Sequence, residues 1–564
     1  MGVPGLFLWL LKKYDLQNLL VQKGNIKQVE YLFIDTNCLL HPQCFKVLGE
    51  VNDKININRL ESKMITNCLE YLEYIIRYVD PSKLVYISID GVAPYAKVKQ
   101  QRLRRFKSAK DAILFNNLKK KYKKPIYSNW TNSSITPGTV FMDKLHKALK
   151  NFINEKLNEY NIIYSSCYIE QEGEHKILQY IRNNIKDDSI NCVIYGLDAD
   201  LIFLSLSTFK DNIYLLREST EFNKNEDSKN LDFVSIDTIK EYIYDEFIYS
   251  IVSKTKLDRN SIIQDFIFLC FFLGNDFLPH LPTISLYTPD KKKMNNGLDL
   301  LLYCYSESFK IYNDYIIKII DDKIIFNKDM IVNILDNLIL FEKEYLINEY
   351  KHKKYFRRYN GNDPYERELY KINNLQFKII NNINLGKDDE KLWKYRYYNK
   401  YYNTDDNLEN TLHDACNEYF KGLVWNSYYY FKKCISWTWF YKFNHGPFLS
   451  DLRTYIKFFD FNNTKFIMNK PLKPLEQLLC VLPPQYAFLL PKSYKFLTLN
   501  TNSPIIHLYP RDFELDMLYK NKYWQCIPNI PNFENNIIEI SSKFKLSKDE
   551  LNRNRKEKLF MNYK

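Results

Sequence analysis

The chain has 564 residues, of which 46% are hydrophobic, so it can bury a large core and is not a disordered protein. It carries 80 Lys and Arg against 67 Asp and Glu, a formal net charge of +13 that favours a polyanionic partner. Its 11 cysteines include no Cys-x-x-Cys pair, which excludes a zinc knuckle and a disulfide framework.

Two sequence signals bear on localisation: a secretory leader and a membrane-spanning segment. The first residues, Met1-Gly2-Val3-Pro4, show no secretory signal pattern, and the longest apolar run, 266–274, is too short to cross a membrane. We therefore expect a soluble protein of a reducing compartment with no membrane partner.

Short apolar runs followed by an aspartate recur along the first 200 residues. They are 31–34 before Asp35, 84–89 before Asp90 and 193–197 before Asp198. Continuous apolar runs are typical of parallel strands covered on both faces, and helix-length segments at 58–77 and 174–186 separate them. The pattern predicts a doubly wound, mostly parallel α/β sheet, and the three aspartates would converge at the carboxyl ends of its strands.

Further acidic residues follow the same pattern. Glu172 and Glu174 lie at a predicted helix start, Asp200 follows Asp198 by two residues, and Asp276 follows the apolar helix predicted at 261–273. Carboxylates gathered in one pocket repel each other unless cations bind, and Mg²⁺ and Mn²⁺ prefer such oxygen ligands. Two such ions can support phosphodiester hydrolysis. The alternatives are helix caps for single aspartates and a solvated acidic face for the set.

A basic segment follows the second aspartate. Residues 97–124 contain twelve Lys or Arg and one acid, Asp111. Four of its side chains fall on one face of a predicted helix and could bind a phosphate: Lys97, Gln101, Arg104 and Arg105. An exposed charged helix or a localisation signal is the alternative. The position next to Asp90 favours a phosphate grip beside a metal site.

The composition changes after residue 345. Residues 348–370 are charged and aromatic, with Gly361 and Pro364 as helix breakers, and 371–564 are rich in Tyr, Trp and Phe. We expect a first domain over 1–345 and a second region over 346–564. Near its end, Ser547 and Glu550 form a capping-box pattern that opens a basic terminal helix.

Taken in order, these residues resemble the eukaryotic 5′-to-3′ exoribonuclease (XRN) family and, more widely, the flap-endonuclease-like nucleases. The matching motifs of the first half are Met1-Gly-Val-Pro, FIDTNCLLHPQC (33–44), IDGVAPYAKVKQQRLRRFKSAKD (89–111), SITPGTVFMDKL (134–145), EGEHKILQYIR (172–182), IYGLDADLIFLSL (194–206), LREST (216–220) and FFLGNDFLPHLP (271–282). Those of the second half are GLVWNSYYYFKKCISWTWFYKFNHGPFLSDL (422–452), KPLEQLLCVLP (473–483) and SPIIHLYPRDFELD (503–516).

The resemblance implies a flap-endonuclease/PIN-like nuclease core and a role for each matching residue. It implies that two Mg²⁺ (or Mn²⁺) ions are held by Asp35, Asp90, Glu172, Glu174, Asp198, Asp200 and Asp276. It implies a 5′-monophosphate pocket made of Lys97, Gln101, Arg104 and Arg105. His41 would stack on the first base, and Trp437 or Trp439 beyond it, with core packing as the alternative for the tryptophans. His175 and His280 would be supporting residues.

The activity that the resemblance implies is processive 5′-to-3′ degradation of single-stranded RNA bearing a 5′-monophosphate, giving nucleoside 5′-monophosphates, in RNA decay. The second region would pack against the first and close the active site. We expect a cytoplasmic monomer, with the nucleus or a virion as alternatives, working with a decapping or 5′-processing partner. The length and the AT-rich codon signature suit a minimal member of the family from a large DNA virus or a compact genome.

Several positions depart from the family pattern. Tyr95 stands where Arg is usual, Lys99 where Asn is usual and Gln171 where Gly is usual, so we expect the edge of the phosphate pocket to differ from that of relatives. The segment 442–446 is less aromatic than usual. Two other functions remain open at this point: a DNA-directed 5′ nuclease, and an RNA-binding scaffold that has lost catalysis.

Overall fold

The computed structural model describes most of the chain, and its described residues form two compact units. Residues outside the description are 1–8, 11–12, 15, 51–54, 127–129, 198–199, 219–229, 252–256, 285, 287–296, 352–358, 360, 377–382, 403–406, 519, 521, 534–535 and 564. Unit 1 comprises Met1–Gln28, Leu178–Lys353 and Asn382–Asn469, and unit 2 comprises Val29–Ile177, Lys354–Asn381 and Lys470–Lys564. Each unit contains segments from both sides of residue 345. The division into a first domain over 1–345 and a second region over 346–564 stays a prediction.

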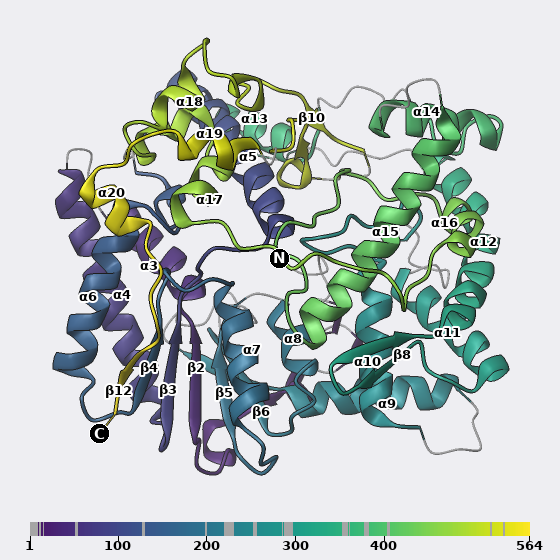
Figure 1. Cartoon of the computed structure of the whole chain (residues 1–564), viewed down its shortest axis with the longest axis horizontal. Helices are drawn as coiled ribbons and strands as arrows, with labels where there is room; N and C mark the ends of the chain where they lie inside the picture. Colours follow the sequence, from purple (N-terminus) through teal and green to yellow (C-terminus); the bar gives the residue numbers. More distant parts are fainter. Residues whose placement is uncertain are drawn as a thin grey trace. The chain divides into compact units, whose positions relative to one another are not determined.

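Unit 2 contains four neighbouring strands that lie side by side in Figure 1. They are β2 (Tyr31–Asp35), β3 (Leu84–Ser88), β4 (Ile162–Ser165) and β12 (Phe560–Asn562). β2 pairs with β3 and β3 with β4 in parallel, whereas β12 pairs antiparallel with β4. Residues 32–34, 84–88 and 162–165 are buried, as expected for apolar strands covered on both faces.

Helices connect and cover these strands. Those of the first half of unit 2 are α3 (Thr36–Glu50), α4 (Ile57–Val79), α5 (Tyr95–Lys121), η2 (Asn132–Ser134), α6 (Val140–Lys156) and the start of α7 (Gly173–Asn184). Side-chain caps fix two of the starts, since Asn56 accepts from Asn58 N–H before α4 and Thr139 from Met142 N–H before α6.

The later segments of unit 2 consist of short elements, two of which contact α5. They are α13 (Pro364–Asn373), α17 (Pro474–Val481), η5 (Pro484–Leu489), α18 (Lys495–Leu499), η6 (Ile506–Leu508), β10 (Leu515–Asp516), η7 (Tyr523–Gln525), β11 (Ile527–Pro528), α19 (Asn536–Ser542) and α20 (Lys548–Arg553). Both α17 and β11 contact α5. The capping box predicted at Ser547 and Glu550 is formed at the start of α20.

Unit 1 also contains four neighbouring strands: β1 (Leu20–Val21), β5 (Cys192–Tyr195), β6 (Ile213–Glu218) and β7 (Leu231–Ser235). β5 pairs in parallel with β6, and β7 pairs antiparallel with both β6 and β1. A separate hairpin joins β8 (Ile317–Ile320) to β9 (Lys323–Phe326).

The helices of unit 1 include an aromatic-rich group, as the sequence predicted. The unit's helices are α2 (Leu16–Leu19), η1 (Lys23–Asn25), α8 (Asp200–Leu206), α9 (Ile236–Ser250), α10 (Arg259–Phe271), α11 (Gly297–Tyr312), α12 (Lys328–Lys351), α14 (Glu390–Tyr402), α15 (Leu408–Phe431), α16 (Leu449–Tyr455) and η4 (Ile456–Phe458). Trp393 and Trp425 are almost fully buried on α14 and α15. Trp425 Nε1 also donates a 3.0 Å hydrogen bond to the Ser436 carbonyl oxygen.

The predicted fold class is confirmed, with antiparallel strands added at the edges. The central strands are parallel and alternate with helices, and α4, α7 and α10 match the helices expected at 58–77, 174–186 and 261–273. The strands β1, β7 and β12, for which no prediction was made, are antiparallel. In the described part of the chain, no helix combines the length and apolar character that a membrane crossing needs.

Candidate active site

The site in unit 2 forms where β2, β3 and the start of α7 meet at Gly173. Asp35 ends β2, Asp90 follows β3, and Glu172 and Glu174 flank this glycine. A Cβ atom at Gly173 would lie 2.9 Å from Asp35 Oδ1 and 3.4 Å from Asp90 Oδ1. Any larger residue at this position would crowd these two aspartates, so glycine lets the start of α7 lie close to them. Asp35, Asp90, Glu172 and Glu174 are thereby brought into one place.

Asp90 is held in place by neutral donors. Asn37 Nδ2 donates to Asp90 Oδ2 at 2.6 Å, and the Gly173 N–H donates to Asp90 Oδ1 at 2.7 Å. Desolvation and the nearby Glu172 carboxylate nevertheless raise the pKa of Asp90, against the opposing effect of Gly173, Lys97 and Lys176. The acidic groups therefore repel one another at this place, and an added cation would relieve that repulsion.

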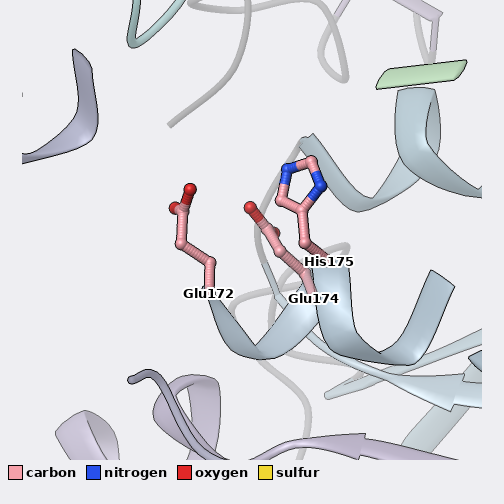
Figure 2. Close-up of side chains that lie close together, drawn as sticks. All are labelled: Glu172, Glu174 and His175. Atoms are coloured by element: carbon pink, nitrogen blue, oxygen red, sulfur yellow. The ribbon is translucent and has the colours of Figure 1, made fainter. Parts of the chain in front are cut away.

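The start of α7 presents a possible set of metal ligands. Ligand atoms of Glu172, Glu174 and His175, all buried, lie within 4.8 Å of one another. Figure 2 shows the three side chains extending in the same direction from the first turn of this helix. The sequence prediction gave His175 a supporting role, and its ring lies beside the Glu174 carboxylate in Figure 2.

The loop that carries Glu172 has an unusual backbone. Gln171 has a φ of 89°, a left-handed conformation that favours glycine, and the sequence comparison had noted Gln at a position where Gly is usual. Two backbone hydrogen bonds hold this conformation, from Gly91 N–H to the Gln171 oxygen at 2.9 Å and from Gln171 N–H to the Val92 oxygen at 2.8 Å. The loops after β3 and before α7 are therefore fixed to each other.

Two lysines face the acidic residues. Lys97 Nζ forms an ion pair with Glu172. Lys176 Nζ is buried and donates to the Ile89 oxygen at 2.7 Å and to the Ser166 oxygen at 3.0 Å. Burial lowers the pKa of Lys176 to about 8, while Asp90 acts in the opposite direction. Sequence reasoning missed Lys176, although it lies inside the motif at 172–182.

The predicted basic helix is α5, and its four candidate phosphate ligands differ in exposure. Gln101 and Arg105 are buried, Lys97 is half-buried and Arg104 is exposed. Arg105 Nη1 is buried without a hydrogen-bond partner among the described residues. Burial and the neighbouring Arg104 lower the pKa of Arg105 to about 9, against the opposing effect of Asp90. A buried guanidinium with an unused donor is suited to binding an anion.

Another arginine of α5 has a different role, which the sequence did not reveal. Arg102 is 1% exposed and donates to the Cys480 oxygen at 2.7 Å, the Pro531 oxygen at 3.3 Å and the Leu508 oxygen. Its guanidinium also lies 4.5 Å from the centre of the Phe106 ring. Arg102 therefore fastens the C-terminal segments of unit 2 to α5.

Two of the positions that depart from the family pattern, Tyr95 and Lys99, are buried on the same helix. The Tyr95 ring packs edge-on against Phe533, with 4.9 Å between ring centres, so it belongs to the core of unit 2. Lys99 is 8% exposed, and burial lowers its pKa to about 7.

Unit 1 contains the remaining candidate acids. Asp200 is buried at the start of α8, and Asp276 lies in the turn after α10, whereas Asp198 falls outside the described residues. Arg217, on β6, donates to the Gly196 oxygen at 3.3 Å and to the Leu197 oxygen, and so holds the backbone just after β5. Asn275 Oδ1 accepts from the backbone N–H groups of 277 and 278, each at 2.9 Å, and so shapes the turn around Asp276.

The candidate stacking residues belong to two segments of the chain, one in each unit. His41 is half-buried on α3 in unit 2. In unit 1, Trp437 is 8% exposed, whereas the partly buried Trp439 donates to Glu418 Oε2 at 3.2 Å and packs against Trp425 with 5.4 Å between ring centres. His280 Nδ1 lies 2.9 Å from the Leu281 oxygen, which fits a supporting role. The contacts of Trp439 are those of a packed residue.

Comparison with known proteins connects both units to one family. The family profile described as XRN 5′-3′ exonuclease N-terminus matches residues 1–219, and the Xrn1 helical domain profile matches 256–368 and 360–563. Human 5′-3′ exoribonuclease 1 is 30% identical over 100% of this chain and 35% of its own length. Arabidopsis thaliana 5′-3′ exoribonuclease 2 is 30% identical over 98% of this chain and 68% of its own length.

The chain thus spans about a third of the human relative, with 35% of that protein covered. Among solved structures, the catalytic core of Rad2 in complex with DNA substrate is similar at 12% identity and a TM-score of 0.29, covering 67% of this chain and 82% of that one.

Proposed function

The chain belongs to the XRN family of 5′-to-3′ exoribonucleases, and we propose that it degrades single-stranded RNA processively from a 5′-monophosphate end, releasing nucleoside 5′-monophosphates in RNA decay. The observation that carries this proposal is the ion pair between Lys97 and Glu172. It places the basic helix α5, with the buried Arg105, directly against the acidic residues at the start of α7. A phosphate-binding helix beside an acidic site is what a nuclease that works from one end requires.

The acidic residues fit divalent cations. Asp35, Asp90, Glu172 and Glu174 gather around Gly173, and burial and the Glu172 carboxylate raise the pKa of Asp90, an effect that a bound cation would oppose. We propose that these residues, with His175 beside them, hold Mg²⁺ or Mn²⁺, and that two ions are used. The family resemblance adds Asp198, Asp200 and Asp276, and we keep that role for them as a proposal. When bound, the ions supply Lewis acidity toward the scissile phosphate and make an attacking water more acidic.

The side chains of α5 bind the end of the RNA in this proposal. Arg105 offers its unused Nη1 to the 5′-phosphate, Lys97 adds a point charge, and Gln101 adds an amide donor. Arg104, which is exposed, contacts the phosphate from the solvent side. The 5′-triphosphate and the cap are larger and differ in charge, so we expect them to be poor substrates.

Base stacking would hold the nucleotides that follow the end. We propose His41 for the first base and Trp437 beyond it, because Trp439 already has packing and hydrogen-bond partners. Stacking on aromatic side chains contributes about 1–3 kcal/mol per base in single-strand binders.

We further propose a cytoplasmic monomer that acts after an enzyme that exposes 5′-monophosphate ends, such as a decapping enzyme. The support for such a partner is chemical. A pocket built around one buried guanidinium suits a monophosphate, which another hydrolase must generate from capped or triphosphate RNA.

The test is nucleotide release from one labelled RNA that bears either a 5′-monophosphate or a 5′-triphosphate, with Mg²⁺ and with EDTA. Release from the monophosphate RNA alone, and only with Mg²⁺, is expected, and DNA of the same sequence should be a poor substrate. Equal release from both RNA ends would contradict the phosphate pocket, and preference for DNA would support a DNA-directed nuclease.

Two variants assign the residues in the same assay. Asp200→Asn should abolish release while RNA binding persists, and unchanged release would remove Asp200 from the metal site. Arg105→Gly should erase the preference for monophosphate ends. Lys120→Gly, an exposed cation on the same helix, is the matched control and should keep that preference.

A further inference from the structure

A glutamine from the C-terminal part of unit 2 lies next to the candidate phosphate ligands. Gln477, on α17, is 0% exposed. Its Oε1 accepts a hydrogen bond from the backbone N–H of Ala93 at 2.7 Å, just before α5 begins. Its Nε2 lies 3.5 Å from Oε1 of Gln101, which is 376 positions away in the sequence.

The Ala93 contact determines which way the Gln477 amide faces. A backbone N–H can only donate, so the Gln477 atom next to it must be the amide oxygen. The other end of the same amide, its NH₂ group, therefore faces Gln101. An NH₂ group can only donate, so the atom of Gln101 that faces it must be the acceptor, Oε1. One backbone donor thus fixes the orientation of two side-chain amides in succession.

The consequence concerns the donor end of Gln101. With its oxygen turned to Gln477, Gln101 presents its NH₂ group on the opposite side of the amide. Within the described part of the chain, the contact with Gln477 is the one hydrogen bond of the Gln101 side chain. Arg105 follows Gln101 by one helical turn on the same face of α5. An NH₂ group attracts a phosphate oxygen, whereas the amide oxygen would repel it.

We propose that Gln477 is a positioning residue for 5′-phosphate recognition, which keeps the NH₂ group of Gln101 directed toward the phosphate. This inference rests on the proposed function. Gln477 acts through Gln101 and does not itself contact the RNA. The motif at 473–483 thereby receives a role that the sequence resemblance left open.

The test is a double-mutant cycle on substrate preference. The full chain is prepared as wild type, Gln477→Met, Gln101→Met and the double variant. For each, kcat/KM is measured on one RNA with a 5′-monophosphate and on the same RNA with a 5′-hydroxyl. The ratio of the two values is the monophosphate preference. Misfolded molecules lower both values equally, so the ratio reports only on active molecules.

The expected result is a fall in the preference of about tenfold for Gln477→Met, the usual effect of losing one hydrogen bond to a charged group. Gln101→Met should lower it by at least as much, and adding Gln477→Met to Gln101→Met should change it no further. Gln485→Met removes a glutamine that bonds the Arg511 oxygen at 3.3 Å instead, and this control should keep the preference.

Two outcomes would overturn the inference. An unchanged preference in Gln477→Met would show that Gln101 is oriented without it. An equal fall in the presence and absence of Gln101 would show that Gln477 acts by another route. If Gln477→Met has no activity on either RNA, Gln477→Glu replaces it, since its carboxylate still accepts from Ala93 N–H but cannot donate to Gln101. A wild-type enzyme without any monophosphate preference would instead refute the phosphate pocket itself, and the inference with it.

Discussion

Unit 2 contains two clusters of charged side chains, one buried and one partly exposed, that differ in how oppositely charged groups are paired. The acidic site gathers four carboxylates around Gly173, and the pKa of Asp90 is raised there by desolvation and by Glu172. The second cluster, which we term the C-terminal cluster, consists of Asp143, His146, Tyr168, Arg555 and Glu557 and lies where the end of the chain meets β4 and α6.

In the C-terminal cluster, the side chains form a connected network. Glu557 pairs with Arg555 at 2.8 Å and with His146 Nε2 at 3.3 Å, and it accepts from Ser166 Oγ at 3.1 Å. The Arg555 guanidinium lies 3.8 Å from the centre of the Tyr168 ring. Tyr168 in turn donates to Asp143 Oδ1 at 2.6 Å.

The difference between the clusters separates a binding role from a stabilising one. Carboxylates of the C-terminal cluster face the cations Arg555, Lys147 and Lys150. Burial opposes ionisation of Glu557, but Arg555 and Lys150 help to lower its pKa. In the acidic site, burial and Glu172 outweigh the favourable neighbours of Asp90 and raise its pKa. On α5, a buried nitrogen of Arg105 lacks a hydrogen-bond partner among the described residues. Ionised groups whose surroundings disfavour their charge are costly inside a protein, so they indicate a ligand of opposite charge.

The strongest way to test this contrast is to neutralise one carboxylate of the acidic site. Glu174→Gln should lower nucleotide release at least about 100-fold, because losing even a group that supports a metal ligand costs 10–100-fold. The melting temperature should stay level or rise, since a repelling charge is removed. Glu170→Gln, on the same loop but paired with Lys556 at 3.5 Å, is the control and should keep its activity. Full activity in Glu174→Gln would exclude it from the site.

Metal removal should affect stability through the acidic site alone. Mg²⁺ or Mn²⁺ at about 100 times its dissociation constant should stabilise the wild type by about 2.7 kcal/mol relative to EDTA, since a ligand that binds the folded state shifts the equilibrium. Thermal melting with and without the ion measures this. Glu174→Gln should show a much smaller shift, while a variant of the C-terminal cluster should keep the full one. Equal shifts in all variants would place the ion elsewhere.

Breaking the C-terminal cluster should reduce stability and leave catalysis intact. Glu557→Ala should cost about 2 kcal/mol, less than a fully buried pair because the side chain is 18% exposed. Thermal melting measures the loss, and nucleotide release well below the melting temperature should match the wild type. Lys558→Ala, an exposed neighbour, is the control. A Glu557→Ala protein that melts like the wild type would show that the network adds no stability.

Measured over one pH unit, the smallest expected effect is a pH dependence of stability from His146. Burial lowers its pKa from 6.5 to about 4, with Glu557 opposing and Lys150 and Arg555 adding to the effect. His146 is therefore protonated below about pH 6.5 in the unfolded chain but only below about pH 4 in the folded chain. Between these values, stability should fall by about 1 kcal/mol for each pH unit of acidification.

Comparing melting temperatures of the wild type and His146→Gln from pH 7 to 4 isolates this contribution. The difference between the two proteins should narrow or reverse as the pH falls. A constant difference would contradict the lowered pKa of His146.

The local features of both units could be predicted from the sequence. The apolar runs that end before Asp35 and Asp90 form the neighbouring parallel strands β2 and β3. A continuous apolar strand must be buried on both faces, which is the situation of a parallel sheet covered by helices. The spacing of Lys97, Gln101 and Arg105 predicted one helix, and α5 contains all three. The strands β4, β6 and β7 were missed, since nothing in the sequence marks their ends as clearly as an aspartate.

The family, the predicted sheet and the candidate residues all follow from the sequence, because periodicity and motif spacing are properties of neighbouring residues. Tertiary structure alone decides which of these candidate side chains have their hydrogen-bonding groups satisfied within the protein. Arg102 and Arg105 are three positions apart on α5. Arg102 donates to three carbonyl oxygens, whereas Nη1 of Arg105 has no hydrogen-bond partner among the described residues. The orientation of Gln101 likewise depends on Gln477, 376 residues away. Burial and hydrogen-bond partners are set by segments distant in sequence, and they determine whether a charge stabilises the fold or is left for a ligand.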